Sequence, residues 1–573
     1  MQKWFQKKTI FPILEIIINI RCSFSIISST TNNYIFASIH HIPIEMKVPN
    51  KKEYDFIIIG SGFGGSVSAL RLVEKGYKVL MLEKGSWWNN DDFPKTNWNL
   101  RKWLWIPSLR FFGFFKITFV RHVGILSGVG VGGGSLVYAN TLPRPKDIFF
   151  NSGSWAGIQD WKNNLEPHYQ TAEKMLGANI NPQLFDADNV LSQVAASNNR
   201  KGYFDPTNVA VYFGEPEISV PDPYFNGLGP DREGCRFCGA CMTGCPHNAK
   251  NSLDKNYLFL AQNKGVEIID KAKATSVQQL KNGDGTKYYE VTFTNSFALI
   301  SGKKQKVRST GIIFSGGVLG TVRLLLNMKK KQLPNLSNKV GDEIRTNNES
   351  LISVVSKNKD SDFSQGVAIG SIYASDENSH LEPVRYGAGS NFWKLMGVPL
   401  TYGGNGFVRA GKLIIHLITS PLSWLRIYFT KNFSQRSIIL LFMQHLDSTV
   451  KFKRGIFGLS SKLSQGPAPS AFMPEAKELA EKVADIVDGK PMVLATEALT
   501  GIPTTAHILG GSVIGKSIES GVIDLDQKVF GYDNMYVCDG SAISANPGVN
   551  PALTITAMTE LAMSKIPMKE NGN

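Results

Sequence analysis

The sequence has few of the features that mark membrane-spanning, disulfide-stabilised or nucleic-acid-binding proteins. No apolar run is long enough to cross a bilayer, and six cysteines, four of them between Cys235 and Cys245, do not make a disulfide framework. No zinc-finger, helix-turn-helix or RNA-binding signature accompanies the net charge of +15, which argues against nucleic acid as a partner. With 42% hydrophobic and 19% charged residues over 573 positions, a globular protein of two or more domains in a reducing compartment is expected.

Residues 1–49 are expected to form an N-terminal extension of the fold. MQKWFQKKTIFPILEIIINIRC has a basic start and an apolar stretch, as in a signal peptide, but Glu15 interrupts the stretch and no cleavage site of small residues follows. Met46 opens MKVPNKKEYDFIIIG just ahead of a predicted strand, so we interpret Met46 as the start and the preceding segment as a gene-model artefact. A weak export signal is the alternative. A cytoplasmic location is therefore predicted ahead of export.

A dinucleotide-binding motif begins the predicted fold. Phe56–Ile59 form a predicted buried strand, and the G-x-G-x-x-G of Gly60, Gly62 and Gly65 follows at the start of a predicted helix. The first glycine permits a tight turn, the second lets backbone approach a pyrophosphate, and the third packs helix on strand. A second predicted strand ends in Glu83, where a carboxylate accepts hydrogen bonds from a ribose. This unit indicates a dinucleotide cofactor without deciding between FAD and NAD.

Three further segments are dense in glycine or carry candidate chemistry. SGVGVGGGSLVYANTLPRP, residues 127–145, has more glycines than a turn needs, so its backbone is expected to lie against a ligand. TTAHILGGSVIG contains His507. NMYVCDGSAISANPGVNPALTITAMTELA predicts a strand, a Pro/Gly loop and an amphipathic helix that begins near Pro551 with Asn550 as its cap.

These four segments together resemble the glucose–methanol–choline (GMC) family of flavin oxidoreductases. Within it, VGGGSLV, H-x-LGG and GVNPALTITA are similar to the cholesterol oxidase branch, and the resemblance covers residues 54–567. It implies an α/β fold: a Rossmann-type FAD-binding domain with a discontinuous substrate-binding domain on an antiparallel sheet. We expect residues 50–330 and 495–568 to form the first domain, with a Cys-rich insert at 235–246, and residues 331–494 the second.

The resemblance also implies a cofactor and site residues. The cofactor is FAD, and the family's His/Asn pair falls on His507 and Asn550. Its active-site glutamate falls on Glu382 in SDENSHLEPVRY, a placement that rests on local spacing. The residues expected to form the FAD site are Gly60, Gly62, Gly65, Glu83, Gly130, Gly133, Gly134, Ser135, Asp539, Gly540 and Pro551.

The residue types suit alcohol oxidation independently of the family. A neutral histidine accepts or positions the hydroxyl proton, because its pKa lies near the working pH. An amide holds the substrate oxygen or the flavin edge without titrating. Glu382 has two interpretations. If it is the family's glutamate, the resemblance implies that it shuttles a proton between carbons of a β,γ-unsaturated ketone; otherwise it only pairs with Arg385 on a surface segment.

The cysteine run CRFCGACMTGCP departs from the best-known members of that family, which work without iron. Its spacing, C-x2-C-x2-C-x3-C-P, is that of bacterial ferredoxins. An iron–sulfur cluster, a zinc ion, and unmetallated thiols or a local disulfide are the alternatives for Cys235, Cys238, Cys241 and Cys245.

Two basic and aromatic stretches are candidates for contact with an anionic bilayer. RKWLWIPSLRFFGFFKITFVRH carries five Lys/Arg and no acid, and residues 405–454 carry eight Lys/Arg against one acid among apolar runs. Such patterning suits peripheral membrane contact, from which a lipid substrate is drawn. The alternative is core residues with solvated flanking charges.

Three functions are compatible with these residues. The leading one is FAD-dependent oxidation of a bulky hydrophobic alcohol such as the 3β-hydroxysteroid cholesterol, with oxygen or another electron acceptor and with Δ5–Δ4 isomerisation as an added step. The second is a sugar or long-chain alcohol dehydrogenase that passes electrons to a cytochrome or quinone. The third, a flavin and iron–sulfur electron carrier, needs neither His507 nor Asn550.

Overall fold

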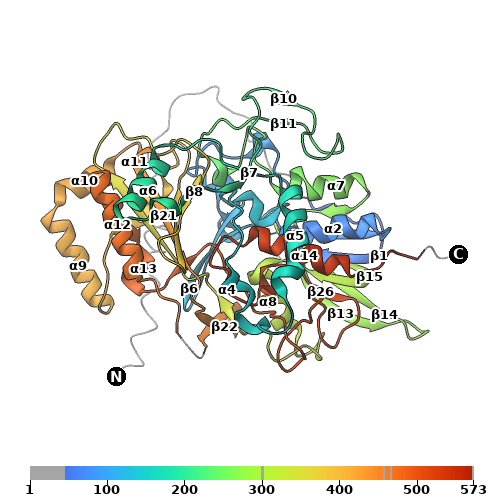
Figure 1. Ribbon diagram of the computed structural model, residues 1–573. Helices are drawn as coiled ribbons and strands as arrows, with labels where there is room; N and C mark the ends of the chain where they lie inside the picture. Colours follow the sequence, from blue (N-terminus) through green and yellow to red (C-terminus); the bar gives the residue numbers. More distant parts are fainter. Residues whose placement is uncertain (1–44, 299–301, 456–457, 465–466, 571–573) are drawn as a thin grey trace, which may run out of the picture. The chain divides into compact units, whose positions relative to one another are not determined.

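The computed structural model describes residues 45–298, 302–455, 458–464 and 467–570, all within the unit that begins at Glu45. The predicted leader-like stretch, residues 1–44, therefore lies outside the described residues. The described chain is built on two large sheets, one mostly parallel and one antiparallel (Figure 1). This arrangement confirms the predicted α/β fold class.

The first sheet carries the dinucleotide motif. Its parallel part has the order β12–β2–β1–β15–β26, and an antiparallel meander continues from β15 through β14 to β13. β15 serves both parts, because its first half pairs with β14 and its last residues pair with β26. The strands are β1 (Glu53–Ile59), β2 (Val79–Leu82), β12 (Glu267–Ile269), β13 (Ala272–Lys281), β14 (Lys287–Asn295), β15 (Gln305–Phe314) and β26 (Met535–Val537).

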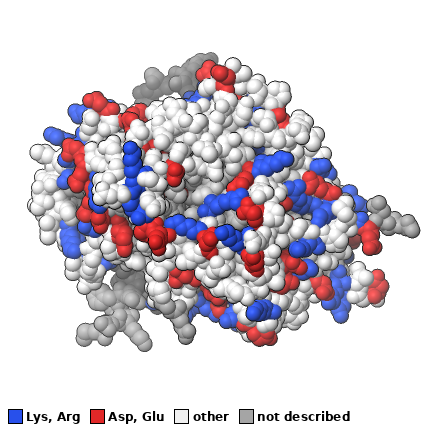
Figure 2. Space-filling view, in the orientation of Figure 1, with Lys and Arg blue, Asp and Glu red and all other residues white. Residues whose placement is uncertain are grey.

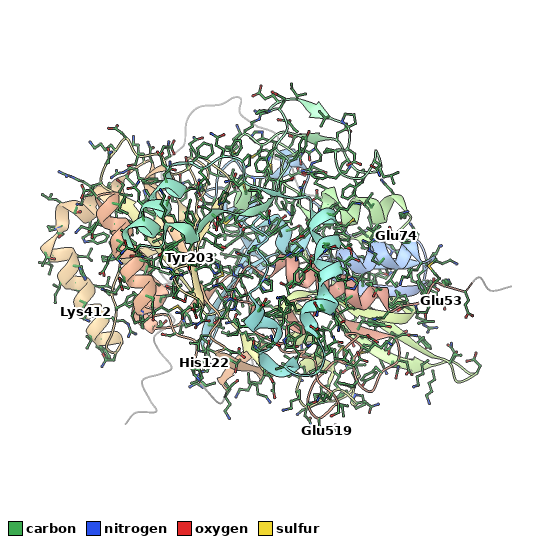
Figure 3. The ribbon with its side chains drawn as sticks, viewed as in Figure 1. Glu53, Glu74, His122, Tyr203, Lys412 and Glu519 are labelled. Carbon is green, nitrogen blue, oxygen red and sulfur yellow. The ribbon has the colours of Figure 1, made fainter. Side chains whose placement is uncertain are left out.

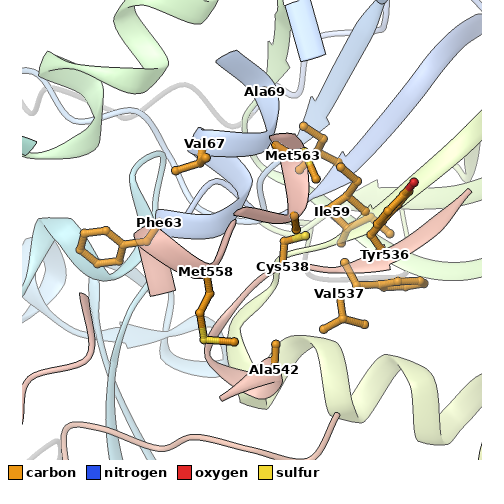
Figure 4. Close-up of a cluster of buried hydrophobic side chains, with 14 of the residues drawn as sticks. Ile59, Phe63, Val67, Ala69, Tyr536, Val537, Cys538, Ala542, Met558 and Met563 are labelled. Atoms are coloured by element: carbon orange, nitrogen blue, oxygen red, sulfur yellow. The ribbon is translucent and has the colours of Figure 1, made fainter. Parts of the chain in front are cut away.

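Helices cover this sheet and form its core with it. α2 (Phe63–Glu74) follows β1 directly, and α14 (Ala552–Ser564) packs against both α2 and α5 (Trp161–Leu176). Figure 4 shows side chains that α2 (Phe63 and Val67), α14 (Met558) and the end of β26 (Val537 and Cys538) contribute to this core. The other helices here are α7 (Tyr257–Asn263) and α8 (Gly317–Met328).

The end of the chain differs in two respects from the sequence prediction. α14 was expected to be amphipathic, but it is buried on nearly all sides, with only Ile555 and Ser564 outside the buried set. Its N-cap is Pro551, and Asn550 does not cap it. The Asn550 amide instead turns towards Glu382 and His507, because that loop lies against the second sheet.

The second sheet is antiparallel, with strand order β20–β24–β17–β21–β19–β18–β8. Segment 331–494 supplies every strand but β8, and the division of the chain into two domains at these residues stays our proposal. The strands are β8 (Phe204–Pro206), β17 (Glu349–Ser356), β18 (Ser371–Tyr373), β19 (Ser379–Val384), β20 (Gly397–Pro399), β21 (Ser437–Gln444) and β24 (Gly489–Leu494).

The two faces of the second sheet have different neighbours. Side chains alternate along a strand, so Ile352, Leu440 and Leu381 share one face. That face packs in an apolar cluster with α6 (Asp186–Ser197) and α12 (Pro474–Ile486). The opposite face is left for the cavity described below.

Smaller elements connect the two sheets. A three-stranded sheet β25–β6–β5 and another of order β16–β22–β23 pack around α8. These strands are β5 (Phe115–Val120), β6 (Val123–Gly128), β16 (Ile344–Arg345), β22 (Thr449–Gly455), β23 (Gly458–Leu463) and β25 (Thr504–Thr505). The remaining strands are β3 (Trp105–Ile106), β4 (Phe111–Phe112), β7 (Ala178–Ile180), β9 (Asn208–Ala210), β10 (Ser219–Val220) and β11 (Arg232–Glu233). The remaining helices are α3 (Leu100–Trp103), α4 (Asp147–Phe150), α9 (Gly406–Thr419), α10 (Pro421–Phe429), α11 (Phe433–Arg436) and α13 (Ala495–Thr500).

Charged side chains of both signs are intermixed over the face seen in Figure 2, despite the positive net charge. Within the described part of the chain, no helix combines the length and the apolar character that a membrane crossing requires.

A partly buried ion pair connects α14 to α2. Arg71 on α2 donates from Nε and Nη2 to the two carboxylate oxygens of Glu560 on α14, at 2.7 and 2.8 Å. The hydroxyl of Tyr257 on α7 donates to the same carboxylate at 2.6 Å. Arg71 also contacts Glu74 at 2.7 Å, on the exposed side of α2.

We predict that Glu560→Ala lowers the free energy of unfolding by about 2 kcal/mol, because it leaves a largely buried guanidinium without its main partner. Urea unfolding followed by circular dichroism measures this. Glu74→Ala removes the exposed partner of the same arginine (Glu74 is labelled in Figure 3) and should cost less than about 0.5 kcal/mol. Equal losses in the two variants would contradict the role given to Glu560.

Candidate active site

One cavity of about 350 Å³ connects the two sheets. It begins at the glycine turn after β1, where Gly60 and Gly62 line it, and passes His507 and Asn550. It ends among apolar side chains of the second sheet and its neighbours: Leu351, Ile369, Val384, Ile439, Leu441, Trp393, Phe433 and Met492. The nucleotide end and an apolar chamber are therefore parts of one space.

The turn between β1 and α2 distinguishes the roles of two glycines. A Cβ atom at Gly62 would have no neighbour within 4 Å, because this position faces the open cavity. A Cβ at Gly65 would lie 2.1 Å from the carbonyl oxygen of Gly60, so Gly65 packs helix on strand and does not line the cavity. The helix α2 begins without a capping side chain, which leaves its first amides to a ligand.

The second glycine loop lies against the first. Gly133 and Gly134 line the cavity, and a Cβ at Gly133 would be 2.7 Å from the Cα of Gly62. Gly130 and Ser135 do not line it. Ser135 instead donates to the carbonyl of Gly132 at 2.7 Å and accepts from the amide of Leu253 at 3.0 Å, and so holds the loop in shape.

Two carboxylates organise the nucleotide end. Glu83 lines the cavity and accepts from the amide and hydroxyl of Ser61, at 3.2 and 2.9 Å. Asp539 accepts from the amide of Ser541 at 2.8 Å and from the hydroxyl of Thr321 at 2.5 Å. Burial raises the pKa of Asp539. Gly540 and Pro551 complete the predicted residues that line the cavity.

Basic side chains also surround this space. Lys84 and Lys116 both line the cavity. Burial, together with the positive charges of Lys84, Arg323 and Lys273, lowers the pKa of Lys116 to about 7. Mutual repulsion of cations of this kind is relieved by a bound anion, so the lining suits a phosphate-bearing ligand.

The register of three strands brings two glutamates to the cavity face of the second sheet. Glu349 stands opposite Met443, which pairs with His380, and Leu351 stands opposite Leu441, which pairs with Glu382. Positions two apart on a strand share a face, so both glutamates lie on the face that carries the apolar lining. Glu382 is fully buried.

His507 connects this sheet to the cavity. Its Nδ1 lies 3.0 Å from Oε2 of Glu349, and its backbone amide donates to Oε1 of the same carboxylate at 3.1 Å. Its Nε2 lies 3.5 Å from Nδ2 of Asn550. Burial alone lowers the pKa of His507, but the Glu349 carboxylate opposes this, and the pKa is raised overall.

Asn550 lies between His507 and Glu382. Its Nδ2 donates to Oε2 of Glu382 at 3.4 Å. Within the described chain, the buried Oδ1 of Asn550 and Oε1 of Glu382 have no hydrogen-bond partner, so both can accept from a ligand. The surface-pair interpretation of Glu382 is wrong, because Arg385 contacts Asp188 at 2.8 Å in the interior.

Sequence reasoning missed two carboxyl groups here. Glu349 holds His507, yet nothing in the sequence near Glu349 signals it, since the contact depends on sheet register. Burial raises the pKa of the neighbouring Glu497 to about 8, so this side chain is mostly uncharged at neutral pH. It accepts from the amide of Thr504 at 2.9 Å and so fixes the strand before His507.

The four clustered cysteines lie apart from these groups. Among the described residues, no three His, Cys, Asp or Glu side chains are arranged to hold a metal ion, and Cys235, Cys238, Cys241 and Cys245 are free thiols. Cys235 packs with Val209, Val211, Ala249 and Val367. Burial raises the pKa of the Cys241 thiol to about 11. This geometry gives no support to the iron–sulfur or the zinc alternative.

The dinucleotide turn, the acid–base group and the chamber that joins them define an oxidoreductase that works with a bound nucleotide cofactor. Comparison with known proteins specifies the class. Residues 54–328 and 466–559 match the N- and C-terminal parts of the GMC oxidoreductase family. The chain therefore belongs to the GMC oxidoreductase family, and it is an FAD-dependent enzyme that acts on alcohols.

Individual relatives give the same assignment. The chain is 44% identical to a cholesterol oxidase of Acinetobacter baumannii, over 91% of this chain and 95% of that protein. It is 42% identical to a cholesterol oxidase of Mycobacterium tuberculosis, over 91% of this chain and 92% of that protein. The crystal structure of pyridoxine 4-oxidase from Mesorbium loti matches with a TM-score of 0.56 at 13% identity, over 89% of this chain and 98% of that one, which shows a shared fold.

The residues present fit FAD. The open position at Gly62 accepts a pyrophosphate, α2 and α14 begin without a capping side chain, and Lys84 and Lys116 supply positive charge.

We predict that Gly62→Val folds but does not retain FAD, because its side chain enters the space for the pyrophosphate. The ratio of flavin to protein absorbance measures retention, and circular dichroism measures folding. Gly65→Val is the matched variant: its Cβ meets backbone, so it should lose folded protein itself. Normal FAD content in Gly62→Val would contradict the assignment of this loop.

Proposed function

We propose that the enzyme oxidises the hydroxyl group of a bulky hydrophobic alcohol, and that its substrate is a 3β-hydroxysteroid such as cholesterol. The observation that carries this is the apolar chamber on the second sheet, which opens directly onto His507 and Asn550. Its lining of Leu351, Ile439 and Val384 suits a rigid apolar skeleton with one polar end. The 44% and 42% identical cholesterol oxidases support the same substrate class.

His507 takes the proton of the alcohol. With Glu349 accepting at Nδ1, the hydrogen of the neutral ring sits on Nδ1 and the lone pair is on Nε2. The contact of Nε2 with Asn550 Nδ2 is long, at 3.5 Å, and the alcohol hydroxyl replaces it on binding. Nε2 accepts the hydroxyl proton, and Glu349 stabilises the imidazolium that results. When bound, FAD accepts the hydride that leaves the carbinol carbon.

Glu382 is placed for a second proton transfer. Its buried Oε1 has no hydrogen-bond partner in the described chain, although it lies 3.4 Å from Nε2 of His380, and it is on the face of the sheet that carries the apolar lining. In a β,γ-unsaturated ketone, the carboxylate would take a proton from the carbon between the carbonyl and the double bond and return it at the far end, which gives the conjugated ketone. Asn550 orients this carboxylate through its 3.4 Å hydrogen bond.

Long-chain alcohols are the alternative substrates, because an apolar chamber also accepts an alkyl chain. Sugars fit less well, since the chamber offers few polar groups beyond His507 and Asn550. We further propose oxygen as the electron acceptor, another acceptor being the alternative, a cytoplasmic location, and contact with a membrane surface that holds the sterol.

The function is tested by adding cholesterol to the FAD-loaded enzyme without oxygen. We predict that the flavin absorbance bleaches and that one sterol ketone forms for each flavin reduced. Ultraviolet absorbance of the product then distinguishes the conjugated Δ4 ketone from the Δ5 ketone. If long-chain alcohols bleach the flavin and cholesterol does not, the sterol assignment is wrong.

We predict that Glu349→Gln shifts the acidic limb of the pH–rate profile to lower pH. The carboxylate raises the pKa of His507, so the wild-type imidazole is protonated, and unable to accept a proton, up to a higher pH. Without that charge, burial lowers the pKa and the base form persists at lower pH. The maximal rate should still fall about tenfold, because the imidazolium formed during reaction loses its partner. The pH dependence of flavin reduction measures both effects.

His507→Ala should retain FAD and lose roughly 10²-fold or more in rate at every pH. His122→Ala is its matched control: this histidine, labelled in Figure 3, contacts Ser461 at 2.9 Å outside the cavity. An unshifted acidic limb in Glu349→Gln, with flavin intact, would show that Glu349 does not act through His507.

A further inference from the structure

Two consecutive helices, α9 and α10, expose an unusual amount of apolar surface. Phe407, Ile414 and Ile418 follow one another along one side of α9 and are 91%, 57% and 71% exposed. On α10, Leu422 and Phe429 are 70% and 79% exposed. We call residues 406–429 the apolar hairpin. It lies at the edge of the molecule in Figure 1, where Figure 2 shows largely uncharged atoms.

The hairpin is a well-formed structure. The side chain of Asn405 caps α9 by accepting from the amides of Phe407 and Val408, both at 3.1 Å. Arg409 is buried and donates to the carbonyl of Ala498 at 2.6 Å, which fixes α9 to α13. The cap and the buried contacts of its inner face therefore fix the helix so that the apolar side chains of its outer face point to solvent.

Charge identifies the partner. From residue 383 to residue 446 the chain has no Asp or Glu, while it has seven Lys or Arg. Three of these, Lys412, Arg426 and Lys431, are exposed on or next to the hairpin (Lys412 is labelled in Figure 3). The next acidic residue along the chain is Asp447, which follows β21. Exposed apolar side chains with basic neighbours and no acids complement an anionic bilayer.

The inner face of the hairpin contacts the wall of the cavity. Trp424 and Ile427 of α10 pack in one cluster with Phe433 and Met492, and both of the latter line the cavity. Leu413 of α9 packs with Val493, another lining residue. A partner bound to the outer face of the apolar hairpin is therefore separated from the apolar chamber by one layer of side chains.

The first basic stretch, residues 101–122, provides a contrast. Trp103, Trp105, Phe114 and Phe115 are all buried, and only Leu109 and Phe119 among its large apolar residues are exposed. The two stretches have similar compositions, but of the two only the apolar hairpin exposes an apolar face.

We propose that the apolar hairpin docks the enzyme on an anionic lipid bilayer, with Phe407, Ile418 and Phe429 entering the interface and Lys412, Arg426 and Lys431 contacting lipid phosphates. α9 has 14 residues and is too short to span a bilayer, so the hairpin lies in the interface. That the docked enzyme draws its substrate from the same bilayer rests on the proposed sterol substrate. The docking itself does not.

The test is co-sedimentation of the full-length, FAD-loaded protein with phosphatidylcholine vesicles, with and without phosphatidylserine, at low and high salt. Wild-type protein should bind, more strongly with phosphatidylserine at low salt. The variant Phe407→Gln/Ile418→Gln/Phe429→Gln should bind at least about tenfold more weakly under all conditions. The variant Lys412→Gln/Arg426→Gln/Lys431→Gln should lose the preference for phosphatidylserine and its salt dependence.

A matched control changes three equally apolar residues elsewhere. Ile180, Ile218 and Leu228 are 67%, 53% and 65% exposed, and Ile180→Gln/Ile218→Gln/Leu228→Gln should bind like wild type. Wild-type protein that stays in the supernatant throughout, or full binding by the apolar hairpin variant, overturns the proposal. So does a wild-type dimer that ignores vesicles and becomes a monomer in that variant, because the partner is then a second copy.

Activity separates this proposal from the proposed function. Cholesterol presented in vesicles should be oxidised more slowly by the apolar hairpin variant, while cholesterol presented in cyclodextrin should be oxidised at the wild-type rate. If neither form of cholesterol reduces the flavin but the binding results hold, the sterol assignment fails and the docking surface stands.

Discussion

The position of the catalytic groups depends on the register in which β17, β21 and β19 pair. On one face of these strands Ile352, Leu440 and Leu381 pack against α6 and α12, and this apolar packing fixes the pairing. Side chains alternate, so the same register places Glu349 and Glu382 on the other face, towards His507 and Asn550. A slip by one residue would turn a glutamate into the apolar core and remove its partner from the cavity. The hydrophobic core on one face of the sheet thus positions the acid–base groups on the other face.

The cofactor end depends on close approach of backbone segments. A Cβ at Gly64 would lie 1.7 Å from the carbonyl oxygen of Cys538, and one at Gly133 would lie 2.7 Å from Gly62. Segments from the start, the first third and the end of the chain therefore meet around the start of α2. The loop with Asn550 belongs to the last of these segments, and the amide of Gly510, shortly after His507, donates to the carbonyl of Gly540 at 2.9 Å. The same contacts therefore bring the catalytic pair to the nucleotide end of the cavity.

Features encoded by local sequence were predictable. The β1–α2–β2 unit, the open position at Gly62 and the His507–Asn550 pair follow from short motifs whose geometry is local or shared with the family. Glu349 was not predictable, because it meets His507 only through the pairing of distant strands. Asn550 was expected as a helix cap by a local rule, yet its amide is used in the cavity. The cysteine spacing suggested a metal site, but packing of Cys235 among valines decides its surroundings, and spacing carries no information on packing.

An experimental structure of the FAD-loaded enzyme with a bound 3β-hydroxysteroid tests the central claim most directly. That claim is that one cavity presents the substrate hydroxyl to His507 while the second sheet holds its apolar skeleton. The predicted result is a steroid oxygen within hydrogen-bond distance of His507 Nε2 and the Asn550 amide, with the rings against Leu351, Ile439 and Val384. A hydroxyl bound away from His507, or a steroid bound outside the face of the sheet that carries Glu349 and Glu382, would contradict the account.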